Sequence, residues 1–202
     1  MRLDEASGPR PVLRRLFRWM NRSVMLPAFR LDLAPWMVNP VTGYFMVLRT
    51  TGRRSGQVRE APVNYAILDG CIYCLAGWGR QTHWFANLLA DPQVTVRLPS
   101  GMVLGEAEEV TDVAEAQRAI VRVARNAGFA LLFDGLNPLT ASDQDILERH
   151  SWMPVVRIRP VGLLGGPHDP DGYGWIGPVV AGGAWVIARR LRRRNRDKTW
   201  GT

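Results

Sequence analysis

The sequence predicts an α+β, mainly β fold: an antiparallel, partly closed barrel with helices packed outside it. Between residues 44 and 110, short apolar runs alternate with tight turns, as in a chain of hairpins. Only two or three helical segments interrupt these runs, so the strict β–helix–β alternation of a parallel, doubly wound sheet is not followed. A small barrel is the arrangement that best satisfies both observations.

We expect three parts along the 202 residues: a basic amphipathic helix within 1–30, the barrel domain in 31–160, and a C-terminal extension in 161–202. In the first part, arginines recur at every fourth position between residues 10 and 22, with apolar residues between them. Pro11 is expected to begin this helix and Pro27 to end it. The helix either packs on its own domain or lies on a membrane surface.

The first strands flank a polar bend. "YFMVL" (44–48) enters the bend and "APVNYAIL" (61–68) leaves it. Asp69 and Gly70 then predict a tight hairpin into "CIYCLA" (71–76). Cys71 and Cys74 are three apart on a strand and point to opposite faces, so we expect two free thiols, as suits a reducing cytoplasm.

The remaining elements follow from turn and cap signals. A short helix is expected from Thr82 to before Pro92, and a second hairpin joins 94–98 to 102–110. Asp112 is the expected N-cap of a helix that Gly128 ends, and another helix is expected from Ser142. The last strand, 153–161, has Val156 and Ile158 on one face and Arg157 and Arg159 on the other.

The C-terminal extension begins with a Gly/Pro/Asp linker, 162–174, followed by an apolar stretch, 175–188. As a helix this stretch would be about 21 Å long, short of the ~30 Å hydrocarbon core of a membrane. The net charge is +8, but the last 14 residues hold seven bases and one acid, so the rest carries only +2. The basic tail therefore favours peripheral contact of 175–198 with an anionic membrane, with docking on a protein as the alternative, and 10–25 could take part in the same membrane contact. Nucleic-acid binding is not expected.

The bend between the first two strands, "LRTTGRRSGQVREAPV", concentrates positive charge. Glycines allow its backbone amides to turn to one side and form an anion-binding nest. Guanidinium groups match phosphate and carboxylate oxygens in pairs, so the bend suits a phosphate or a carboxylate-rich tail. It is neither a Walker loop nor a Rossmann fingerprint. A solvated turn is the simpler alternative.

A second segment, "GWGRQTHWFANLLADP" (77–92), offers glycines at a strand end and then a helix. Arg80 could join the anion site and Asn87 could hydrogen-bond a polar ligand. Trp84 and Leu88 share one helix face, so core packing is the alternative for Trp84.

Together, "LRTTGRRSGQVREAPV" and "GWGRQTHWFANLLADPQVTV" resemble the deazaflavin (coenzyme F-420)-dependent nitroreductase family, a branch of the flavin/deazaflavin oxidoreductases with a split β-barrel. The resemblance covers about residues 15–160 and includes "MNRSVMLPAFRLDLAPWM". The family is abundant in actinobacteria, which agrees with the 25 arginines and single lysine that suggest a GC-rich genome.

The resemblance implies a binding site for the phosphate and oligoglutamate tail of coenzyme F-420 at the bend, with the ring between the second strand and the glycine segment. The implied cofactor-binding residues are Thr51, Arg53, Arg54, Ser55, Gly56, Arg59, Pro62, Val63, Asn64, Gly77, Trp78, Gly79, Arg80, Trp84 and Asn87. The implied substrate pocket holds Phe133, His150 and Trp152. FMN is the alternative cofactor, but its single phosphate would use fewer arginines.

The resemblance thus implies a reductase that transfers a hydride from reduced F-420 to a lipophilic quinone-like or nitroaromatic acceptor. No catalytic side chain is expected because the cofactor carries the chemistry. The three histidines have no metal-ligand spacing, so no metal is expected. The alternatives are a non-catalytic split-barrel protein that binds a lipid, haem or another cofactor, and an adaptor that acts through its basic tail. A cytoplasmic enzyme at the inner face of the plasma membrane is the favoured interpretation.

Overall fold

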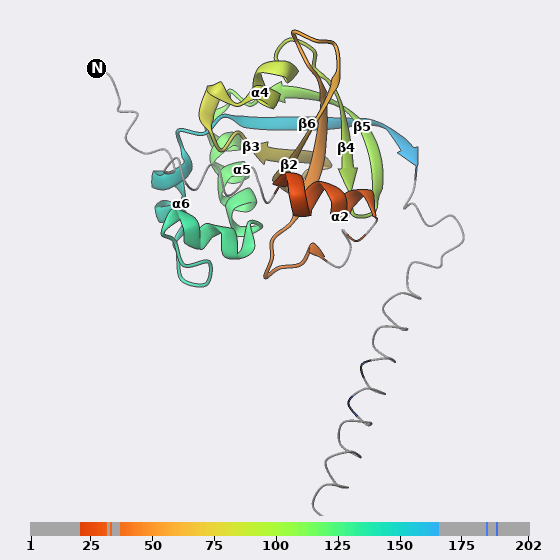
Figure 1. Cartoon of the computed structure of the whole chain (residues 1–202). Coiled ribbons are helices and arrows are strands. Elements are labelled where there is room, and N and C mark those ends of the chain that lie inside the picture. The colour runs from red at the N-terminus through yellow and green to blue at the C-terminus, as the bar shows by residue number, and fades with distance from the viewer. Residues whose placement is uncertain (1–20, 32, 34–36, 166–184, 186–188, 190–202) are drawn as a thin grey trace, which may run out of the picture. The chain divides into compact units, whose positions relative to one another are not determined.

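A computed structural model of the chain describes residues 21–31, 33, 37–165, 185 and 189. Within these residues, six antiparallel strands form a closed barrel in the order β1-β2-β3-β6-β5-β4 (Figure 1). The strands are β1 (Phe45–Thr51), β2 (Val58–Leu68), β3 (Cys71–Leu75), β4 (Gln93–Leu98), β5 (Gly101–Glu109) and β6 (Val155–Gly165). The predicted antiparallel barrel is confirmed. It closes more fully than expected, because β4 pairs back onto β1 over three residues.

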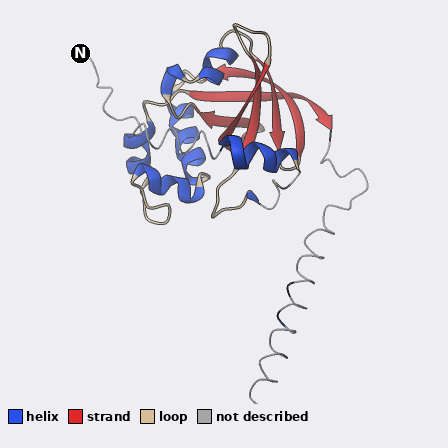
Figure 2. Cartoon of the chain, viewed as in Figure 1, coloured by secondary structure: helices blue, strands red, loops and turns tan. Residues whose placement is uncertain are grey.

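Helices lie outside the barrel (Figure 2), as predicted. They are η2 (Asn21–Met25), α2 (Leu26–Arg30), η3 (Gly79–Gln81), α4 (His83–Leu88), α5 (Val113–Arg125), η4 (Gly128–Asp134) and α6 (Asp143–His150). Asp112 is the N-cap of α5, where its side chain accepts the backbone N–H of Glu115. Ser142 and Asp145 form a reciprocal capping box at the start of α6.

The expected end of the first helix at Pro27 is wrong. The π-helix η2 is followed directly by α2, which contains Pro27 in its first turn and continues to Arg30. Proline is tolerated there because the N–H groups of a first helical turn have no partner within the helix. The described residues begin at Asn21, so the part of the predicted helix from Pro11 to residue 20 lies outside them.

Three apolar clusters pack on the two faces of the sheet, and the smallest of them joins Met25 and Phe29 to Phe45 and Val47 of β1. The core inside the barrel contains Phe85 and Leu88 of α4 together with strand residues, among them Met46, Leu48, Cys74, Val96, Val156 and Ile158. The outer core joins α5, η4 and α6 to Ala66, Tyr73 and Val155. Cys74 belongs to the inner core and Cys71 packs against the outer one, so the two thiols face opposite ways, as predicted.

The pairing of β2 changes along its length. Its C-terminal part, Tyr65–Leu68, pairs with β3 through the predicted turn, where Asp69 and Gly70 have φ values of 51° and 76°. Its N-terminal part, Val58–Asn64, pairs with β1, and the register with β3 stops at Tyr65. We call the side of Val58–Asn64 that faces away from β1 the open edge of β2. Pro62 fits this position, because a proline cannot donate a ladder hydrogen bond.

Strand β6 continues to Gly165, past the expected domain boundary at 160, because its end pairs with Met102–Leu104 of β5. The chain divides after Gly165, and the unit described here ends at that residue. The predicted linker beyond 165 and nearly all of the predicted apolar helix and basic tail lie outside the described residues. In the part of the chain that is described, no helix has both the length and the apolar character needed to cross a membrane.

Candidate functional site

The bend between β1 and β2 (residues 52–57) is closed by its own backbone. The N–H of Gly52 donates to the carbonyl of Gln57 at 2.8 Å, and the N–H groups of Ser55 and Gly56 both donate to the carbonyl of Gly52. Gly56 has the positive φ of 64° that this turn requires. These three amides therefore do not form the predicted anion nest, because they already have acceptors within the bend.

Three exposed arginines give the bend its charge: Arg53 and Arg54 within it and Arg59 on β2. Arg59 donates to the Ser55 hydroxyl at 3.3 Å, which holds the guanidinium against the turn. Among the described residues, none of the three forms an ion pair with a carboxylate, whereas Arg30, Arg49, Arg80, Arg125, Arg157 and Arg159 do. Their charge is thus available to an external anion.

Asn87 connects the bend to α4. Its amide oxygen accepts hydrogen bonds from the backbone N–H and the guanidinium of Arg53, both at 3.3 Å, and its amide nitrogen donates to the Thr50 hydroxyl at 3.2 Å. Asn87 and Thr50 are buried, and Thr51, the last residue of β1, is half-buried. Figure 1 shows α4 beside the tip of the β1–β2 hairpin. The structure therefore brings together the bend and the helix that the sequence predicted to share a site.

The carboxylate nearest to the bend along β2 is Glu60, and its negative charge is paired with two arginines outside the bend. Burial would raise the pKa of Glu60, but hydrogen bonds from Arg30 of α2 and Arg49 of β1 outweigh burial and lower it. Glu60 is therefore ionised and engaged by those two guanidinium groups, so it does not compensate the charge of the bend.

The predicted ring-binding residues lie on either side of the point where β2 and β3 part. Val63 packs against the inner core, and Pro62 and Asn64 therefore face the opposite side of the strand. Asn64 donates to the carbonyl of Tyr44 at 3.2 Å. Across from them, the glycine segment follows the end of β3. Gly77 has open space where a Cβ would lie, and Gly79 has a φ of 67°.

The aromatic and basic residues of the segment 77–92 contact different parts of the structure. Trp84 packs against the inner core, edge-on to Phe85, so core packing explains it. Trp78 is half-buried. Arg80 forms an ion pair with Glu109 of β5 and lies 5.8 Å from the Phe85 ring, so its guanidinium is engaged there and not at the bend. No motif in the sequence pointed to Glu109 or Thr50.

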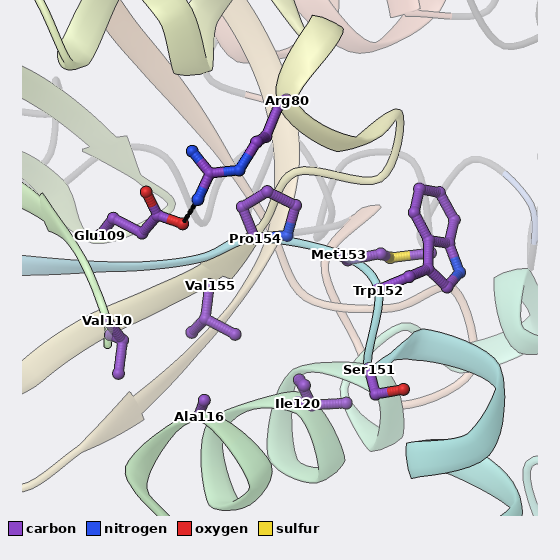
Figure 3. A pocket seen from close by; sticks show the side chains of 10 residues that line it. All are labelled: Arg80, Glu109, Val110, Ala116, Ile120, Ser151, Trp152, Met153, Pro154 and Val155. Carbon is purple, nitrogen blue, oxygen red and sulfur yellow. Dashed lines mark hydrogen bonds and ion pairs between the residues drawn. The ribbon is translucent and has the colours of Figure 1, made fainter. Parts of the chain in front are cut away.

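A pocket of about 250 Å³ lies next to Arg80 (Figure 3). The Arg80–Glu109 pair borders one side and Trp152 another, above α5. A Cβ on Gly79 would lie 3.3 Å from the Trp152 ring, so the ring and the glycine segment are in contact. The lining residues are Arg80, Glu109, Val110, Ala116, Ile120, Ser151, Trp152, Met153, Pro154 and Val155.

The three predicted substrate residues do not share this pocket. Trp152 lines it, but His150 is buried, with its ring nitrogens 2.9 Å from the Ile146 carbonyl and 3.2 Å from an Asp134 carboxylate oxygen. Phe133 is exposed and meets Phe129 edge to face. In the described residues, no group of three or more His, Cys, Asp or Glu could hold a metal ion.

Comparisons with known proteins indicate which family and which solved structures the chain resembles. Residues 35–130 match the model of the family described as F420H(2)-dependent quinone reductase. No curated protein matches the chain. Among solved structures, an F420-H2 dependent reductase is 19% identical, over 57% of this chain and 93% of that one, with a TM-score of 0.38. A conserved hypothetical protein of Mycobacterium tuberculosis is 19% identical over 69% and 81% (TM-score 0.46), and a haem storage protein of Vibrio cholerae is 14% identical over 71% and 94% (TM-score 0.44).

Proposed function

The match of residues 35–130 to the F420H(2)-dependent quinone reductase family confirms the resemblance to the deazaflavin-dependent reductases, and from this premise we propose an activity. The protein is an oxidoreductase that binds coenzyme F-420 at the bend and reduces a lipophilic quinone-like or nitroaromatic acceptor. FMN is the alternative cofactor.

One observation carries the proposal: three exposed arginines without a carboxylate partner among the described residues gather at one bend, next to the open edge of β2. Three guanidinium groups at one turn repel one another, and an external polyanion relieves this repulsion. A tail with a phosphate and several carboxylates offers a partner to each of Arg53, Arg54 and Arg59. A single phosphate would satisfy fewer of them.

The chain's own residues bind and orient the cofactor. The arginines of the bend and Ser55 would hold the anionic tail, with Arg53 kept in place by Asn87. Pro62, Val63 and Asn64 on β2 and Gly77, Trp78 and Gly79 after β3 would border the ring, and Gly77 lets a flat group approach its backbone closely. When bound in its reduced form, the coenzyme supplies a hydride; a quinone takes up this hydride and one proton to become a quinol.

The test is a fluorescence titration of the purified protein with oxidised F-420 and, in parallel, with FMN. The double variant Arg53→Ala/Arg54→Ala should lose at least tenfold in F-420 affinity. Arg118→Ala/Arg122→Ala is the matched control, because it removes two exposed arginines from α5, away from the bend, and changes the net charge equally. Equal F-420 affinity in both double variants contradicts the proposed role of the bend, and tighter binding of FMN contradicts the cofactor.

The alternative is a non-catalytic split-barrel protein that only binds its ligand. A turnover assay distinguishes it from the reductase. Oxidation of reduced F-420 that depends on added menadione supports the reductase. Tight binding without any such turnover favours the alternative.

Peripheral membrane contact through 10–25 and 175–198 remains part of the proposal. The charge argument predicts that the full-length protein pellets with anionic vesicles, and that replacing the seven bases of 189–198 by glutamine releases it. Equal pelleting of both proteins would exclude an electrostatic attachment by the tail.

A further inference from the structure

We propose that one end of the barrel, formed by the β4–β5 turn and the last residues of β6, inserts shallowly into an anionic lipid bilayer. We call this end the charge-free tip, and it comprises residues 98–105 and 160–165. The proposal goes beyond the membrane contact proposed for 10–25 and 175–198, because it concerns side chains of the barrel itself. It does not depend on the identity of the cofactor.

The tip lacks charged side chains but exposes apolar ones. Its two segments read "LPSGMVLG" and "PVGLLG". On β6, Val161 is 60% exposed, Leu163 84% and Leu164 48%. Neighbouring large apolar side chains that remain in contact with water mark a surface that binds a partner.

The apolar side chains of the tip leave both faces of the sheet. Leu163 lies opposite Val103 and Gly162 opposite Leu104, and successive pairs of this kind point to opposite faces. The register between β5 and β6 shifts twice here, so that Val161 and Leu164 have no residue opposite them on β5. A flat protein surface would cover only one face, whereas a bilayer surrounds side chains that project from both.

The edge of β6 is also uncovered by β3 at the tip. The pairing of β3 with β6 stops at Ile158, while β6 continues to Gly165. Side chains at the end of β6 can therefore reach a surface without displacing a neighbouring strand.

Arginines border the tip where it meets the rest of the barrel. Arg97 lies opposite Met102, and Arg159 lies opposite Glu106. Arg159 forms an ion pair with Glu108 at 2.7 Å, but its side chain is 54% exposed and a guanidinium has five N–H donors. Long arginine side chains at this level can bind lipid phosphates while leucines enter the acyl region.

The sequence that follows the tip indicates which partner covers it. Gly165 leads through the linker to the apolar stretch 175–188 and to the seven bases of 189–198. Such a basic segment is attracted to anionic lipid. Because it continues directly from the tip, binding of either to a bilayer raises the effective concentration of lipid for the other.

The tip and the bend lie at opposite ends of the barrel. Arg97, the residue before the tip, is paired with Val47 near the start of β1, whereas the bend follows Thr51 at its end. Figure 1 likewise shows the end of β6 far from the tip of the β1–β2 hairpin. The arginines of the bend therefore stay in water when the charge-free tip contacts lipid.

The test compares two double variants of the full-length protein. Leu163→Gln/Leu164→Gln makes the tip polar, and Leu132→Gln/Leu139→Gln makes the same change at exposed leucines of η4 and the loop after it. Partitioning is measured without cofactor, by co-sedimentation with vesicles of phosphatidylglycerol and phosphatidylcholine in equal amounts. We expect the tip variant to partition at least tenfold more weakly than the wild type and the control to stay within twofold. Melting curves should verify that both variants fold.

Two further measurements separate insertion of the tip from attachment by the tail. The ratio between wild type and tip variant should persist at about 0.5 M salt, which screens the tail but not an apolar contact. A polarity-sensitive fluorophore on Leu163→Cys should shift its emission to the blue when vesicles are added, and one on Leu139→Cys should not. Both are made in a Cys71→Ser background, because Cys71 is partly exposed.

Equal partitioning of the wild type and the folded tip variant overturns the proposal, as does an unshifted fluorophore at position 163. If the tip variant instead dissociates a dimer in analytical ultracentrifugation and binds vesicles normally, the tip is an interface between copies and the proposal is likewise overturned. Failure of the protein to bind F-420 would contradict the proposed function and leave these measurements unaffected.

Discussion

The amide oxygen of Asn87 accepts two hydrogen bonds from Arg53, one from its backbone N–H and one from its guanidinium. Asn87 is buried on α4, and its amide nitrogen reaches the Thr50 hydroxyl at the end of β1. One buried side chain therefore fixes the start of the bend in backbone and side chain alike. The bend is closed by its own hydrogen bonds, and the hydrogen bonds of Asn87 connect it to α4.

Replacing Asn87 should loosen the bend. Asn87→Ala leaves the Thr50 hydroxyl and the Arg53 N–H without this partner, which should lower the free energy of unfolding by about 1–3 kcal/mol. It should also weaken F-420 binding several-fold, because Arg53 is no longer held. Urea denaturation and the F-420 titration measure the two effects, with Gln117→Ala on the exposed face of α5 as the control. Wild-type behaviour in both measurements would show that the contact is incidental.

Acid should weaken the attachment of Glu60 to its two arginines. Burial would raise the pKa of Glu60, but hydrogen bonds from Arg30 and Arg49 lower it below the ordinary 4.5. A lowered folded-state pKa contributes stability that is fully present above the unfolded-state pKa and is lost as pH falls through the folded-state pKa. At pH 7, Glu60→Gln should cost on the order of 1 kcal/mol of unfolding free energy.

The cost of Glu60→Gln should shrink steadily once the pH is below about 4.5, because the wild-type carboxylate becomes protonated there. Denaturation curves from pH 7 to 3 measure it. The control is Glu106→Gln on the exposed face of β5. If the loss of unfolding free energy in Glu60→Gln does not change with pH, the charge of Glu60 contributes nothing to stability.

The two cysteines should differ in reactivity. Cys74 is fully buried in the inner core, and this burial raises its pKa to about 12, whereas Cys71 is partly exposed. Because the thiolate is the reactive form, iodoacetamide at pH 8 should alkylate Cys71 at least about 100-fold faster. Peptide mapping by mass spectrometry after short exposures measures the two rates. Equal rates in the folded protein would contradict the assignment of the two faces of β3.

Gly128 should tolerate no side chain. Its φ is +58°, and a Cβ there would lie 2.4 Å from the carbonyl oxygen of Val41 and 2.6 Å from the backbone nitrogen of Gly43. Gly128→Ala should therefore lower the unfolding free energy by about 2–4 kcal/mol, from backbone strain and from displaced backbone atoms. Gly70→Ala is the control: its φ is +76° but its Cβ would meet nothing within 4 Å, so only about 1 kcal/mol is expected. Equal costs would contradict the close approach at Gly128.

Local patterns predicted much of the fold. The Asp69-Gly70 turn and the Asp112 cap are set by a few adjacent residues, and both were correct. The alternation in the last strand was correct as well, since Val156 and Ile158 face the inner core while Arg157 and Arg159 bind Glu108 outside. Such features follow from turn chemistry and side-chain periodicity, which one sequence contains in full.

Contacts between segments that are far apart in the sequence were harder to predict. The sequence placed Arg80 near the bend, but β3 and β5 both pair with β6, and this brings Arg80 to Glu109, 29 residues away. It placed His150 in a pocket, but the packing of α6 buries it beside Asp134. The backbone amides of the bend were expected to be free for an anion. Their acceptors within the bend depend on the loop conformation, which local sequence patterns do not define. Pro62 within a long strand is a sequence feature that indicates an edge.

The open edge of β2 also bears on how this protein avoids self-association. An unpaired strand is a template on which another chain can add a strand of its own, the first step toward aggregation. Here the half of the strand that does not pair with β3 carries Arg59, Glu60 and Pro62, two charges and a residue without an N–H, all unfavourable for recruiting a neighbour. The residues that leave the backbone accessible to a small molecule thus make it a poor surface for another polypeptide.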